Sequence, residues 1–587
     1  MLLINSVQIK QLYILNNGLL VGAGTAGCVL ASRLSEDPNV KVLVVEAGDH
    51  MEYFTKIPLT PTAAQQGPND WSVRTTAQKY SSFGMWGQSQ FIPRGKGLGG
   101  SGQINFLLHG FGLTTDYDRW TRLGWKGWSE EDLRPYFIKA FGTARSEFDS
   151  SHCAADADCP GAKVPMKLKL IDEDNELMNT FKQTSAAFKT NTIFRRPTAT
   201  IQEGGRHSSL DAYLKPVMKR KNLHILLRTQ AVSIRFENNT ASSLYILQNS
   251  RELNNIFANK EIILCAGAIK TPQLLMLSGI GPPDLLRRLK INLVSGNEEV
   301  GQNLHDHMNM PIYVSIQRPI SITLSKVFTL STLTEYYWKN SGPLSFPPVA
   351  GVEYLNDSAV TLFSMGTASE RLLRDLSNYK PQVFRDTFPF YNITHKEGFM
   401  FLATCLQPKS RGVVTLAKSI TTMPPVVDPN YLKQPYDILC LIKAIRRAEQ
   451  LVLSKPFQDI GAWIHWPRPE RCLPLWRYTR EEQKGPTQRR RRFKDQPKPK
   501  PKTKSVHLSP PDAYLECIIR EVAVTGHHVG GTCSGGKVVD EELRVKSTSG
   551  LRIVDASVLP SPVSLYPNSV IIAIAEKAAE IILSTSN

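Results

Sequence analysis

The sequence predicts an α/β protein in which a Rossmann-like, doubly wound parallel sheet is joined to an α+β part built on an antiparallel sheet. A glycine-rich turn follows a short apolar run and opens a helix at 21–31, and a second apolar run, 42–45, ends in an acid, Glu46. This order of strand, turn, helix, strand and acid is the dinucleotide-binding fingerprint. From about residue 310 the chain is richer in Thr, Ser, Tyr and Phe, with turn-rich landmarks typical of an antiparallel sheet.

The first glycine turn has the chemistry of a dinucleotide site. Gly22 permits the tight turn, Gly24 lets the backbone approach a pyrophosphate, and Gly27 lets the helix pack closely on its strand. The helix N-terminus offers unpaired N–H groups to the phosphates, and Glu46 is expected to accept both ribose hydroxyls. The residues predicted to bind the cofactor here are Gly22, Gly24, Thr25, Ala26, Gly27, Glu46 and Ala47.

A second glycine-rich run follows at 93–106. Because each glycine adds to the entropy cost of folding, such a run indicates a backbone that approaches something flat or phosphorylated. A nicotinamide fold does not usually need this second cradle, whereas a flavin dinucleotide does. The sequence therefore favours FAD, and an NAD-dependent dehydrogenase is the weaker alternative. The candidate FAD contacts in this run are Arg94, Gly95, Gly99, Gly100, Ser101 and Asn105.

Length and composition set broad limits. A chain of 587 residues is too long for one core and suggests two or three domains. Its 41% hydrophobic and 21% charged residues are ordinary for a globular protein. Because no apolar run approaches the roughly 18 residues that cross a bilayer, we expect a soluble or peripheral protein without a transmembrane segment.

The net charge of +18 is unevenly distributed. Residues 477–504 hold twelve Lys or Arg and three acids, a net charge of +9. Its arginine run and alternating Pro-Lys pairs predict a disordered basic insertion. We expect no specific nucleic-acid partner, although weak binding of polyanions or anionic membrane through this insertion is an alternative role.

The cysteines, the glycosylation sequons and the N-terminal residues say less about the function and leave the localisation open. Nine cysteines without CxxC pairs indicate neither a zinc site nor a disulfide framework, although Cys153 and Cys159 are close enough in sequence to pair. Sequons at Asn238, Asn356 and Asn392 slightly favour an extracellular location. Residues 1–20 make a poor signal peptide and, with Asn16-Asn17-Gly18, a disrupted first strand, which suggests an incomplete or altered N-terminus. No metal site and no oligomeric state are predicted.

Several long motifs, in order, resemble the glucose-methanol-choline (GMC) oxidoreductase family. The resemblance spans about 19–584 and is strongest to the glucose-dehydrogenase-like members of insects. The matching segments are 93–106, 116–120, 127–129, 267–281, 300–307 and 550–557. It implies an FAD enzyme that oxidises the CH–OH group of an alcohol or sugar. Because the Ser101-Gly102 turn has no His or Cys, we expect the FAD to be non-covalent.

The resemblance also assigns residues. Aligned on Gly531-Thr532-Cys533, His528 falls on the family's catalytic histidine, the expected general base, and Asn568 falls on the second active-site position. In the family the backbone of Val232 meets the adenine. Asp555 and Ala556 belong to the C-terminal motif and are further candidate FAD contacts, as is Asn568; Asn105 is expected beside the flavin ring. His527, His305 and His307 are interpreted as packed, structural histidines.

The expected domains follow from the motifs. Residues 19–310 form the N-terminal part of the FAD-binding domain, 311–510 the substrate domain with the 477–504 insertion, and 511–587 the return to the FAD domain. Within them we expect strands at 223–227, 231–234 and 261–266, a helix beginning at Thr271-Pro272, a helix over 437–453, and Asn568 as the N-cap of the last helix.

The predicted reaction is hydride transfer from a small alcohol or sugar to FAD, with His528 taking the hydroxyl proton and electrons passing to a quinone-type acceptor or O₂. Three departures from the family concern the site: the proline usual after the catalytic histidine is missing, the loop after Cys533 is short, and residues 563–568 place bulk where a small residue and Asn are expected, close to the substrate. The substitutions near Asn568 support an alternative, a catalytically inactive member that binds a ligand or polyanion.

Overall fold

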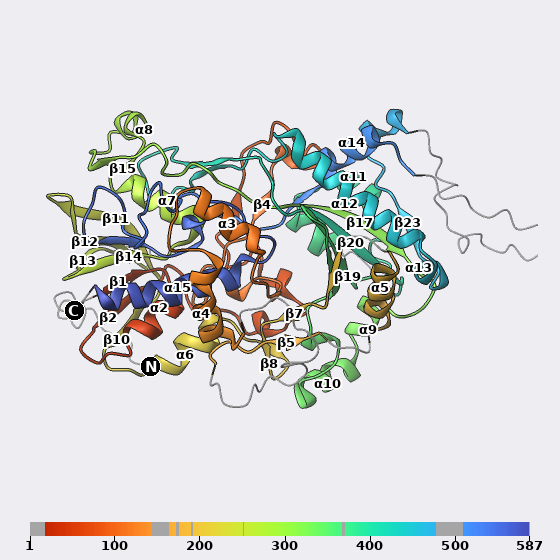
Figure 1. Cartoon of the computed structure of the whole chain (residues 1–587), viewed down its shortest axis with the longest axis horizontal. Helices are drawn as coiled ribbons and strands as arrows, with labels where there is room; N and C mark the ends of the chain where they lie inside the picture. Colours follow the sequence, from red (N-terminus) through yellow and green to blue (C-terminus); the bar gives the residue numbers. More distant parts are fainter. Residues whose placement is uncertain are drawn as a thin grey trace, which may run out of the picture.

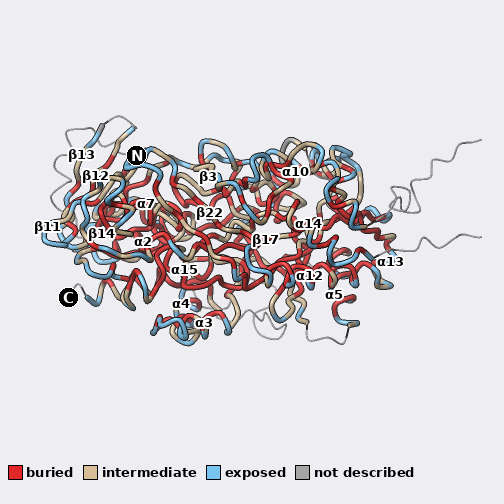
Figure 2. The backbone as a smooth tube through the Cα atoms, turned by 90° about the horizontal axis from the view of Figure 1, so that it is seen from above, coloured by how far each residue is buried: buried red, intermediate tan, exposed pale blue. Residues whose placement is uncertain are grey.

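The computed structural model describes residues 18–143, 164–171, 175–188, 192–249, 252–366, 370–476 and 509–585. Two sheets lie side by side along the long axis of the molecule (Figure 1). We call the part around the five-stranded parallel sheet the parallel-sheet half, and the part around the larger sheet the antiparallel-sheet half. Buried backbone runs through the middle of both halves, with exposed positions on the outside (Figure 2).

The parallel sheet has the strand order β10-β2-β1-β14-β25, and every neighbouring pair is parallel. This is the Rossmann-like sheet that the sequence predicts. Its last strand comes from the C-terminal region, so the chain returns to this half after building the other. The strands are β1 (Gly18–Val21), β2 (Val42–Val45), β10 (Leu223–Leu226), β14 (Glu261–Leu264) and β25 (Leu551–Ile553).

The first strand is better formed than the sequence predicts. β1 begins at Gly18, directly after the two asparagines that were expected to disrupt it, and Leu19 and Leu20 are completely buried. Four residues are enough because β1 lies at the centre of the sheet and is paired on both sides, with β2 and with β14. The remainder of the predicted disruption, at residues 1–17, lies outside the described residues.

Two helices pack together beside this sheet, α2 (Thr25–Leu34) and α15 (Pro567–Ser584). Between them the fully buried carboxylate of Glu576 accepts two hydrogen bonds from Arg33, at 2.7 and 2.8 Å, and one from the Tyr213 hydroxyl at 2.8 Å. Because a buried charge is tolerated only when paired, this cluster fixes the two helices to each other.

The helix after β14 begins earlier than the sequence predicts. α7 spans Gly267–Leu277, so Thr271 and Pro272 lie inside it. Pro272 cannot donate to the carbonyl of Ala268 one turn earlier, and that carbonyl instead accepts from the Thr532 hydroxyl at 2.6 Å. The carboxylate of Asp555 accepts from the Gly267 N–H, at 2.9 Å, and from the Thr271 hydroxyl, at 2.6 Å. These contacts from the C-terminal region let a helix with an internal proline start at Gly267.

The antiparallel sheet has the order β23-β17-β20-β19-β18-β6, and β24 pairs with β17. All of these pairs are antiparallel, as predicted. α12 (Pro435–Leu453), which contains the predicted helix 437–453, packs on β19 and β20. The strands are β6 (Ile193–Arg195), β17 (Met308–Ser315), β18 (Val349–Tyr354), β19 (Ser358–Phe363), β20 (Gly398–Cys405), β23 (Trp463–His465) and β24 (Val524–Thr525).

Two disulfides correct the expectation that no disulfide framework is present. Cys405–Cys440 joins β20 to α12, and Cys472–Cys517 joins a short helical turn to α14 (Asp512–Val522). Their partners are 35 and 45 residues apart in sequence, so local spacing gives no sign of them. Cys28, Cys265 and Cys533 are free and buried, whereas Cys153 and Cys159 lie outside the described residues.

The remaining elements connect and cover the two sheets. The basic insertion 477–504 lies outside the described residues. Asn238, Asn356 and Asn392 are all exposed. Across the described ranges no helix is long and apolar enough to span a membrane.

A second antiparallel sheet borders the parallel-sheet half and contains β11 (Thr229–Glu237), β12 (Thr240–Gln248) and β13 (Glu252–Phe257), which include the predicted strand 231–234. The other helices are α3 (Thr114–Arg122), α4 (Glu130–Phe141), α5 (Glu176–Ala187), α6 (Lys215–Val217), α8 (Pro283–Arg288), α9 (Leu324–Val327), α10 (Leu330–Lys339), α11 (Pro381–Thr387) and α13 (Lys455–Asp459). The two-stranded pairs are β3 (Val73–Arg74) with β4 (Phe91–Ile92), β5 (Lys169–Leu170) with β7 (Thr198–Ala199), β8 (Ile201–Gln202) with β9 (Gly205–Arg206), β15 (Ile280–Gly281) with β16 (Ser295–Gly296), and β21 (Val413–Thr415) with β22 (Val426–Asp428).

Candidate active site

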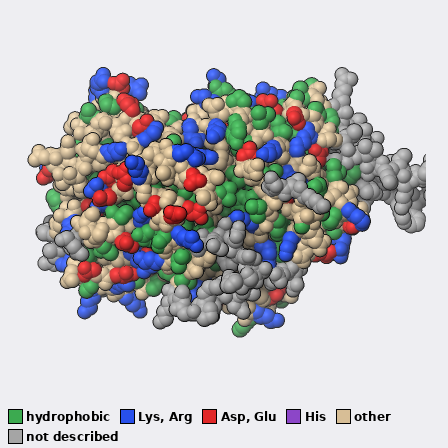
Figure 3. Space-filling model, in the orientation of Figure 1, with side chains coloured by type: hydrophobic (Ala, Val, Ile, Leu, Met, Phe, Trp, Pro, Cys, Tyr) green, Lys and Arg blue, Asp and Glu red, His purple; other side chains and the backbone are tan. Residues whose placement is uncertain are grey.

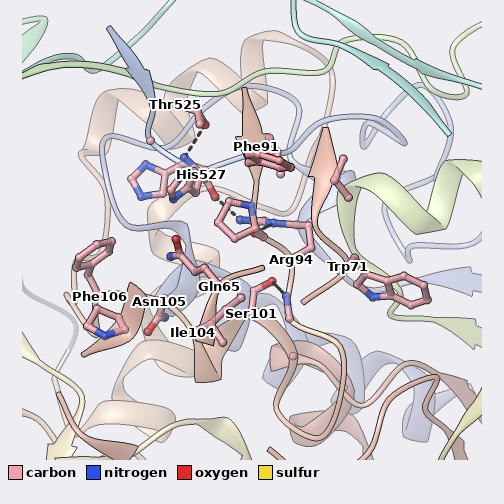
Figure 4. A pocket seen from close by; sticks show the side chains of 18 of the residues that line it. Gln65, Trp71, Phe91, Arg94, Ser101, Ile104, Asn105, Phe106, Thr525 and His527 are labelled. Carbon is pink, nitrogen blue, oxygen red and sulfur yellow. Dashed lines mark hydrogen bonds between the residues drawn. The ribbon is translucent and has the colours of Figure 1, made fainter. Parts of the chain in front are cut away.

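A single cavity of about 720 Å³ reaches from the carboxyl ends of β1 and β2 to one face of the antiparallel sheet. Ligands of open α/β sheets bind at the carboxyl ends of the strands, so its position agrees with the predicted site. Most of the predicted cofactor contacts line it: Gly22, Gly24, Thr25, Ala26, Glu46, Ala47, Arg94, Gly95, Gly100, Ser101, Asn105, Asp555, Ala556 and Asn568. Figure 4 shows part of its wall, with Arg94, Ser101 and Asn105 among the labelled residues.

The first glycine turn is held by close backbone contacts. A Cβ at Gly27 would lie 2.0 Å from the carbonyl oxygen of Gly22, and one at Gly22 would lie 2.6 Å from that of Cys265. Gly22 also has a φ of +108°, which side chains rarely allow. Gly27 does not line the cavity; as predicted from its place in the fingerprint, it lets α2 pack against the turn.

The two glycine runs meet. The Gly99 N–H donates to the carbonyl of Ala23 at 2.8 Å, and a Cβ at Gly100 would lie 2.8 Å from the Cα of Gly24. The second run therefore continues the wall that the first begins, although they are more than seventy residues apart in sequence. Gly99 supports this contact without lining the cavity. Two backbone cradles in one cavity suit a cofactor with two ends, such as FAD.

Glu46 is buried, and its carboxylate is oriented by backbone. One oxygen accepts from the Ala23 N–H at 2.9 Å and the other from the Gly48 N–H at 2.8 Å. Burial raises the pKa of Glu46, and these N–H groups oppose that rise. The Gly97 N–H also acts on this carboxylate. Since a carboxylate has about four acceptor positions, acceptor capacity is left for a ribose hydroxyl. These contacts fit the predicted ribose role.

Other predicted contacts have different surroundings. Val232 does not line the cavity, whereas its neighbour Ala231 does, next to a bulge in β11. Asp555 lines the cavity, but its carboxylate is occupied by the start of α7 and by the Ser557 N–H. Asn105 is held by buried Arg206, which donates to its side-chain and backbone oxygens at 2.5 and 2.7 Å.

His528 takes part in a hydrogen-bonded relay that fixes its tautomer. Nε2 of His307 lies 2.9 Å from the carbonyl of Leu406, and Nδ1 of His307 lies 3.1 Å from Nδ1 of His528. Because a carbonyl only accepts, Nε2 of His307 carries the proton and its Nδ1 accepts. Nδ1 of His528 is then the donor, and its Nε2 keeps a free lone pair. His307 is thus more than the packed histidine that the sequence predicts.

Burial keeps this pair neutral. It lowers the pKa of His528 well below the usual value, and the positive charges that His307, His527 and Arg94 would carry lower it further. Burial also lowers the pKa of His307, although the Leu406 carbonyl and Asp306 oppose that shift. The Asp306 carboxylate accepts from the backbone N–H of His528 at 2.7 Å and fixes the residue in place. At neutral pH His528 is an uncharged proton acceptor in the cavity wall.

The turn before His528 is anchored from the second glycine run. His527 has a φ of +63°, and its carbonyl accepts from the Arg94 guanidinium at 2.6 Å (Figure 4). The His527 N–H donates to the Thr525 hydroxyl at 2.9 Å. Burial lowers the pKa of His527 to about 3. Its ring lines the cavity, so His527 is a wall residue as well as a packed one.

Asn568 lies in the first turn of α15 rather than at the predicted N-cap, because the helix begins at Pro567 and Tyr566 is the cap. Its side-chain oxygen accepts from the Thr25 hydroxyl at 3.0 Å. Since the amide nitrogen carries two donors, Asn568 keeps N–H groups for a ligand in the cavity. Tyr566, with the unusual φ of 24°, lines the same wall, and its ring centroid lies 6.2 Å from that of His528.

Packing against His305 explains the two glycines, Gly530 and Gly531, that follow Val529. A Cβ at Gly530 or Gly531 would lie within 2.7 Å of the ring of His305. His305 is buried, and neither ring nitrogen has a hydrogen-bond partner among the described residues. His305 therefore packs against the turn, as the sequence predicts.

Sequence reasoning missed the wall formed by the antiparallel sheet. Alternate residues of three adjacent strands point into the cavity: Asn309, Pro311 and Tyr313 of β17, Thr361 and Phe363 of β19, and Met400, Leu402 and Thr404 of β20. The residues between them, such as Ile312 and Phe401, belong to the core below α12. The period of two is visible in the sequence, but the sequence does not tell which of the two faces meets the cavity.

A second missed feature is a pair of lysines on Trp71, which lines the cavity. The ammonium nitrogens of Lys96 and Lys270 lie 4.8 and 4.3 Å from the centroid of its ring. Burial and the charge of Lys96 lower the pKa of Lys270 to about 8. The pair gives this wall positive charge that a bound anion would neutralise.

Known proteins match the chain along most of its length. The model of the GMC oxidoreductase N-terminal domain matches residues 16–309 and that of the C-terminal domain matches residues 408–575. The chain is 36% identical to "Neither inactivation nor afterpotential protein G" of Drosophila melanogaster, covering 97% of this chain and 90% of that protein. It is 27% identical to the glucose dehydrogenase [FAD, quinone] of the same species, covering 96% and 85%.

The fold also matches solved structures. Pyridoxine 4-oxidase from Mesorbium loti superposes with a TM-score of 0.73 at 23% identity, covering 96% of this chain and 98% of that one. The matches agree with the two glycine cradles, the parallel sheet and the histidine in the cavity wall. The chain belongs to the GMC oxidoreductase family, whose members are FAD-dependent oxidoreductases that act on CH–OH donors.

Proposed function

We propose that the protein oxidises the CH–OH group of an alcohol that carries an apolar body, with His528 as the general base and Asn568 as the second polar contact to the reacting oxygen. The observation that carries this proposal is the relay from Leu406 through His307 to His528. It leaves the lone pair of Nε2 on a neutral histidine free, with no hydrogen bond to it among the described residues.

The chain's residues supply the proton chemistry. Held against the two glycine runs of the cavity, FAD would supply the acceptor for the hydride of the alcohol carbon. His528 takes the hydroxyl proton, which lets negative charge develop on the oxygen as the hydride leaves. The N–H donors of Asn568 stabilise that charge. The N-terminus of α15, which begins beside Asn568, adds the positive end of a helix dipole. Arg94 and Asp306 hold the backbone of the His527-His528 turn in place.

The sheet wall favours an apolar substrate body over a sugar. The Asn309 side chain accepts from the Thr404 hydroxyl at 2.5 Å, and the Tyr313 hydroxyl donates to the carbonyl of Gly366. With the Asn309 oxygen and the Tyr313 hydroxyl already paired, the N–H groups of Asn309 are left as donors beside them, fewer than the several hydroxyls of a sugar need. Burying an unpaired hydroxyl is costly, whereas a hydrocarbon body gains from the rest of the lining. Other apolar residues there are Leu324, Val327, Phe328, Met365, Leu373, Leu376 and Phe388.

The final electron acceptor would be O₂ or a quinone-type compound. Measuring hydrogen peroxide formation against reduction of a soluble quinone separates the two, because only transfer to oxygen yields peroxide.

The test is anaerobic reduction of the FAD-loaded protein by single alcohols, followed by its visible absorbance. We expect bleaching by decanol or a fused-ring secondary alcohol and much less by glucose. His528→Ala should slow bleaching by about 10²- to 10⁴-fold, while His395→Ala, a change at an exposed histidine, should leave the rate unchanged.

Two results would contradict the proposal. Equal bleaching by His528→Ala and the wild type would remove His528 as the base. A flavin that binds but is reduced by none of the alcohols would favour the alternative, an inactive member that keeps the fold and binds a ligand.

A further inference from the structure

An outward-facing apolar surface is formed by α10 and by Phe328, the residue that follows α9. Phe328, Leu330 and Trp338 are 72%, 81% and 82% exposed, and Leu333 and Tyr337 are 42% and 55% exposed. We call these five residues the α9–α10 patch. Apolar side chains are visible at the lower edge of the molecule, where α10 lies (Figures 1 and 3). Single exposed apolar residues are ordinary, but a group of this kind marks an interaction site.

The direction of this apolar face is fixed by the fold. Thr332 and Tyr336, one helical turn apart, are buried, and Tyr336 packs with Leu59, Val327 and Leu344. Leu330, Leu333 and Tyr337 have the spacing of the opposite face of the helix. The Thr329 side chain caps the start of α10 by accepting from the Thr332 N–H at 3.1 Å, and Asn340 ends it with a φ of 52°. The amphipathic helix is therefore held with its apolar side outward.

The patch is continuous with the active-site cavity. Leu324, Val327 and Phe328 line the cavity, and Phe328 is also a member of the patch. One residue thus belongs to both the inner wall and the outer surface. We infer from this shared residue that the cavity opens next to the patch.

Charge contributes little to this surface. Residues 321–342 contain two lysines and one glutamate, and Lys326 is paired with Glu397 at 2.7 Å. Tryptophan and tyrosine, each with an apolar body and a polar edge, are enriched where proteins meet the membrane interface. A surface of this kind binds by burying apolar area rather than by attracting anionic headgroups.

We propose that the α9–α10 patch docks the protein on a lipid bilayer, with the cavity entrance turned toward the membrane. The docking can be measured without a substrate. The added role, delivery of an alcohol dissolved in the bilayer to His528, rests on the proposed function. Lipid is favoured over a protein partner because the patch adjoins the entrance, where a bound protein would obstruct the route, whereas fluid lipid would not.

The test is co-sedimentation of the full, FAD-loaded chain with phosphatidylcholine vesicles, which carry no net charge. The wild type is expected to bind, and the double variant L330S/W338S is expected to lose binding by about tenfold or more. Leu253→Ser and Leu439→Ser change residues that are 64% and 65% exposed elsewhere on the surface, and both should bind like the wild type.

Raising the salt from about 0.1 M to about 1 M shortens the reach of charges from roughly 10 to 3 Å, yet binding should persist. Loss of binding in high salt would overturn the proposal and assign membrane attraction to the net positive charge. Equal binding by L330S/W338S and the wild type would overturn it as well. A lipid-free dimer that L330S/W338S converts to a monomer would assign the patch to a second copy of the chain instead.

A third measurement separates docking from chemistry. L330S/W338S should oxidise a water-soluble alcohol at the wild-type rate but oxidise a vesicle-bound alcohol at least about tenfold more slowly. If neither protein oxidises any alcohol while the wild type still binds vesicles and the variant does not, the proposed function fails and the docking surface stands.

Discussion

The two sides of the active-site cavity are built in different ways. On the parallel-sheet side the wall is mostly backbone, and glycines let segments approach closely, as where Gly100 meets Gly24. On the antiparallel-sheet side the wall consists of side chains, such as Pro311, Phe363 and Leu402, that alternate with core residues along each strand. One side is suited to a fixed ligand with phosphates, the other to a substrate that differs between relatives.

This contrast concerns tolerance to substitution. A close backbone contact leaves no room for even one methyl group, so the parallel-sheet side should fail when a glycine that makes such a contact, such as Gly27, is changed. A side-chain wall can be altered one position at a time without affecting the strands that carry it. The two sides should therefore respond very differently to single substitutions.

The largest effect is expected for Gly27→Ala. The new methyl group would lie 2.0 Å from the carbonyl oxygen of Gly22, a contact that requires the turn or α2 to move. We expect loss of FAD binding, measured as the ratio of visible to ultraviolet absorbance of the purified protein. Gly18→Ala is the matched control, because a Cβ there would meet no described heavy atom within 4 Å. A Gly27→Ala protein with full flavin content would contradict the comparison.

The antiparallel-sheet half is also stabilised by a buried ion pair. Arg447 of α12 donates two hydrogen bonds, at 2.8 and 2.7 Å, to the fully buried carboxylate of Glu353 on β18. Arg447→Met leaves that charge without a counter-ion, held among the described residues only by the hydroxyls of Ser185 and Thr192, and should cost about 3–5 kcal/mol of stability, measured by thermal unfolding. Flavin content in the folded protein should stay unchanged because the pair lies in the other half.

Two controls sharpen this prediction. Lys455→Met breaks an ion pair whose side chains are 84% and 60% exposed and should cost at most about 1 kcal/mol. Adding Glu353→Gln to Arg447→Met removes the unpaired charge and should recover part of the loss. If Arg447→Met lowered the thermal stability no more than Lys455→Met, the buried pair would not stabilise this half more than an exposed pair does.

The pH dependence of activity tests His528 and His307, which lie where the two sides of the cavity meet. His528 works as a base only when neutral, and its pKa is lowered, so activity should persist as the pH falls through 6.5 and decline only below it. His307→Leu removes the acceptor that fixes the tautomer and should lower kcat about 10- to 100-fold, by analogy with other orienting contacts.

His307→Gln serves as the conservative variant. Glutamine can still donate to the Leu406 carbonyl and accept from His528, so it should recover much of the rate that leucine loses. The measurement is kcat/KM from pH 5 to 8 for all three proteins. A wild-type acid limb centred near the ordinary histidine value, or equal rates for the leucine and glutamine variants, would contradict a tuned and oriented base.

The sequence predicted the parallel-sheet side well because its information is local. Gly22, Gly24, Gly27 and Glu46 lie within twenty-five residues of one another, and the chemistry of a dinucleotide explains each of them. The start of α7 differs from the prediction because Asp555 and Thr532, which are 288 and 264 residues from their partners in sequence, satisfy the groups around Gly267 and Pro272.

The other side depends on contacts that sequence spacing does not reveal. His307 and His528 are 221 residues apart, so their hydrogen bond could not be predicted from either motif. The same holds for Cys405 and Cys440, which pair across β20 and α12. The alternation in β17 is visible in the sequence, yet only the packed structure shows which face α12 covers and which face the cavity meets.

The smallest expected effect belongs to the side-chain wall. Leu402→Thr replaces an apolar residue at the centre of the sheet face with a polar one of smaller volume, and removes contacts with the substrate body. One lost methylene-sized contact in an apolar pocket changes discrimination by about 10- to 200-fold, so kcat/KM for decanol should fall about tenfold, mainly through KM. The rate for a short alcohol such as ethanol should be nearly unchanged, since it does not extend as far as β20. Flavin content and thermal stability should remain close to wild type, in contrast to Gly27→Ala.

Equal losses of kcat/KM for the long and short alcohols would place Leu402 in the catalytic geometry rather than in the substrate wall. The division of the cavity into two differently built sides would then not hold at that residue.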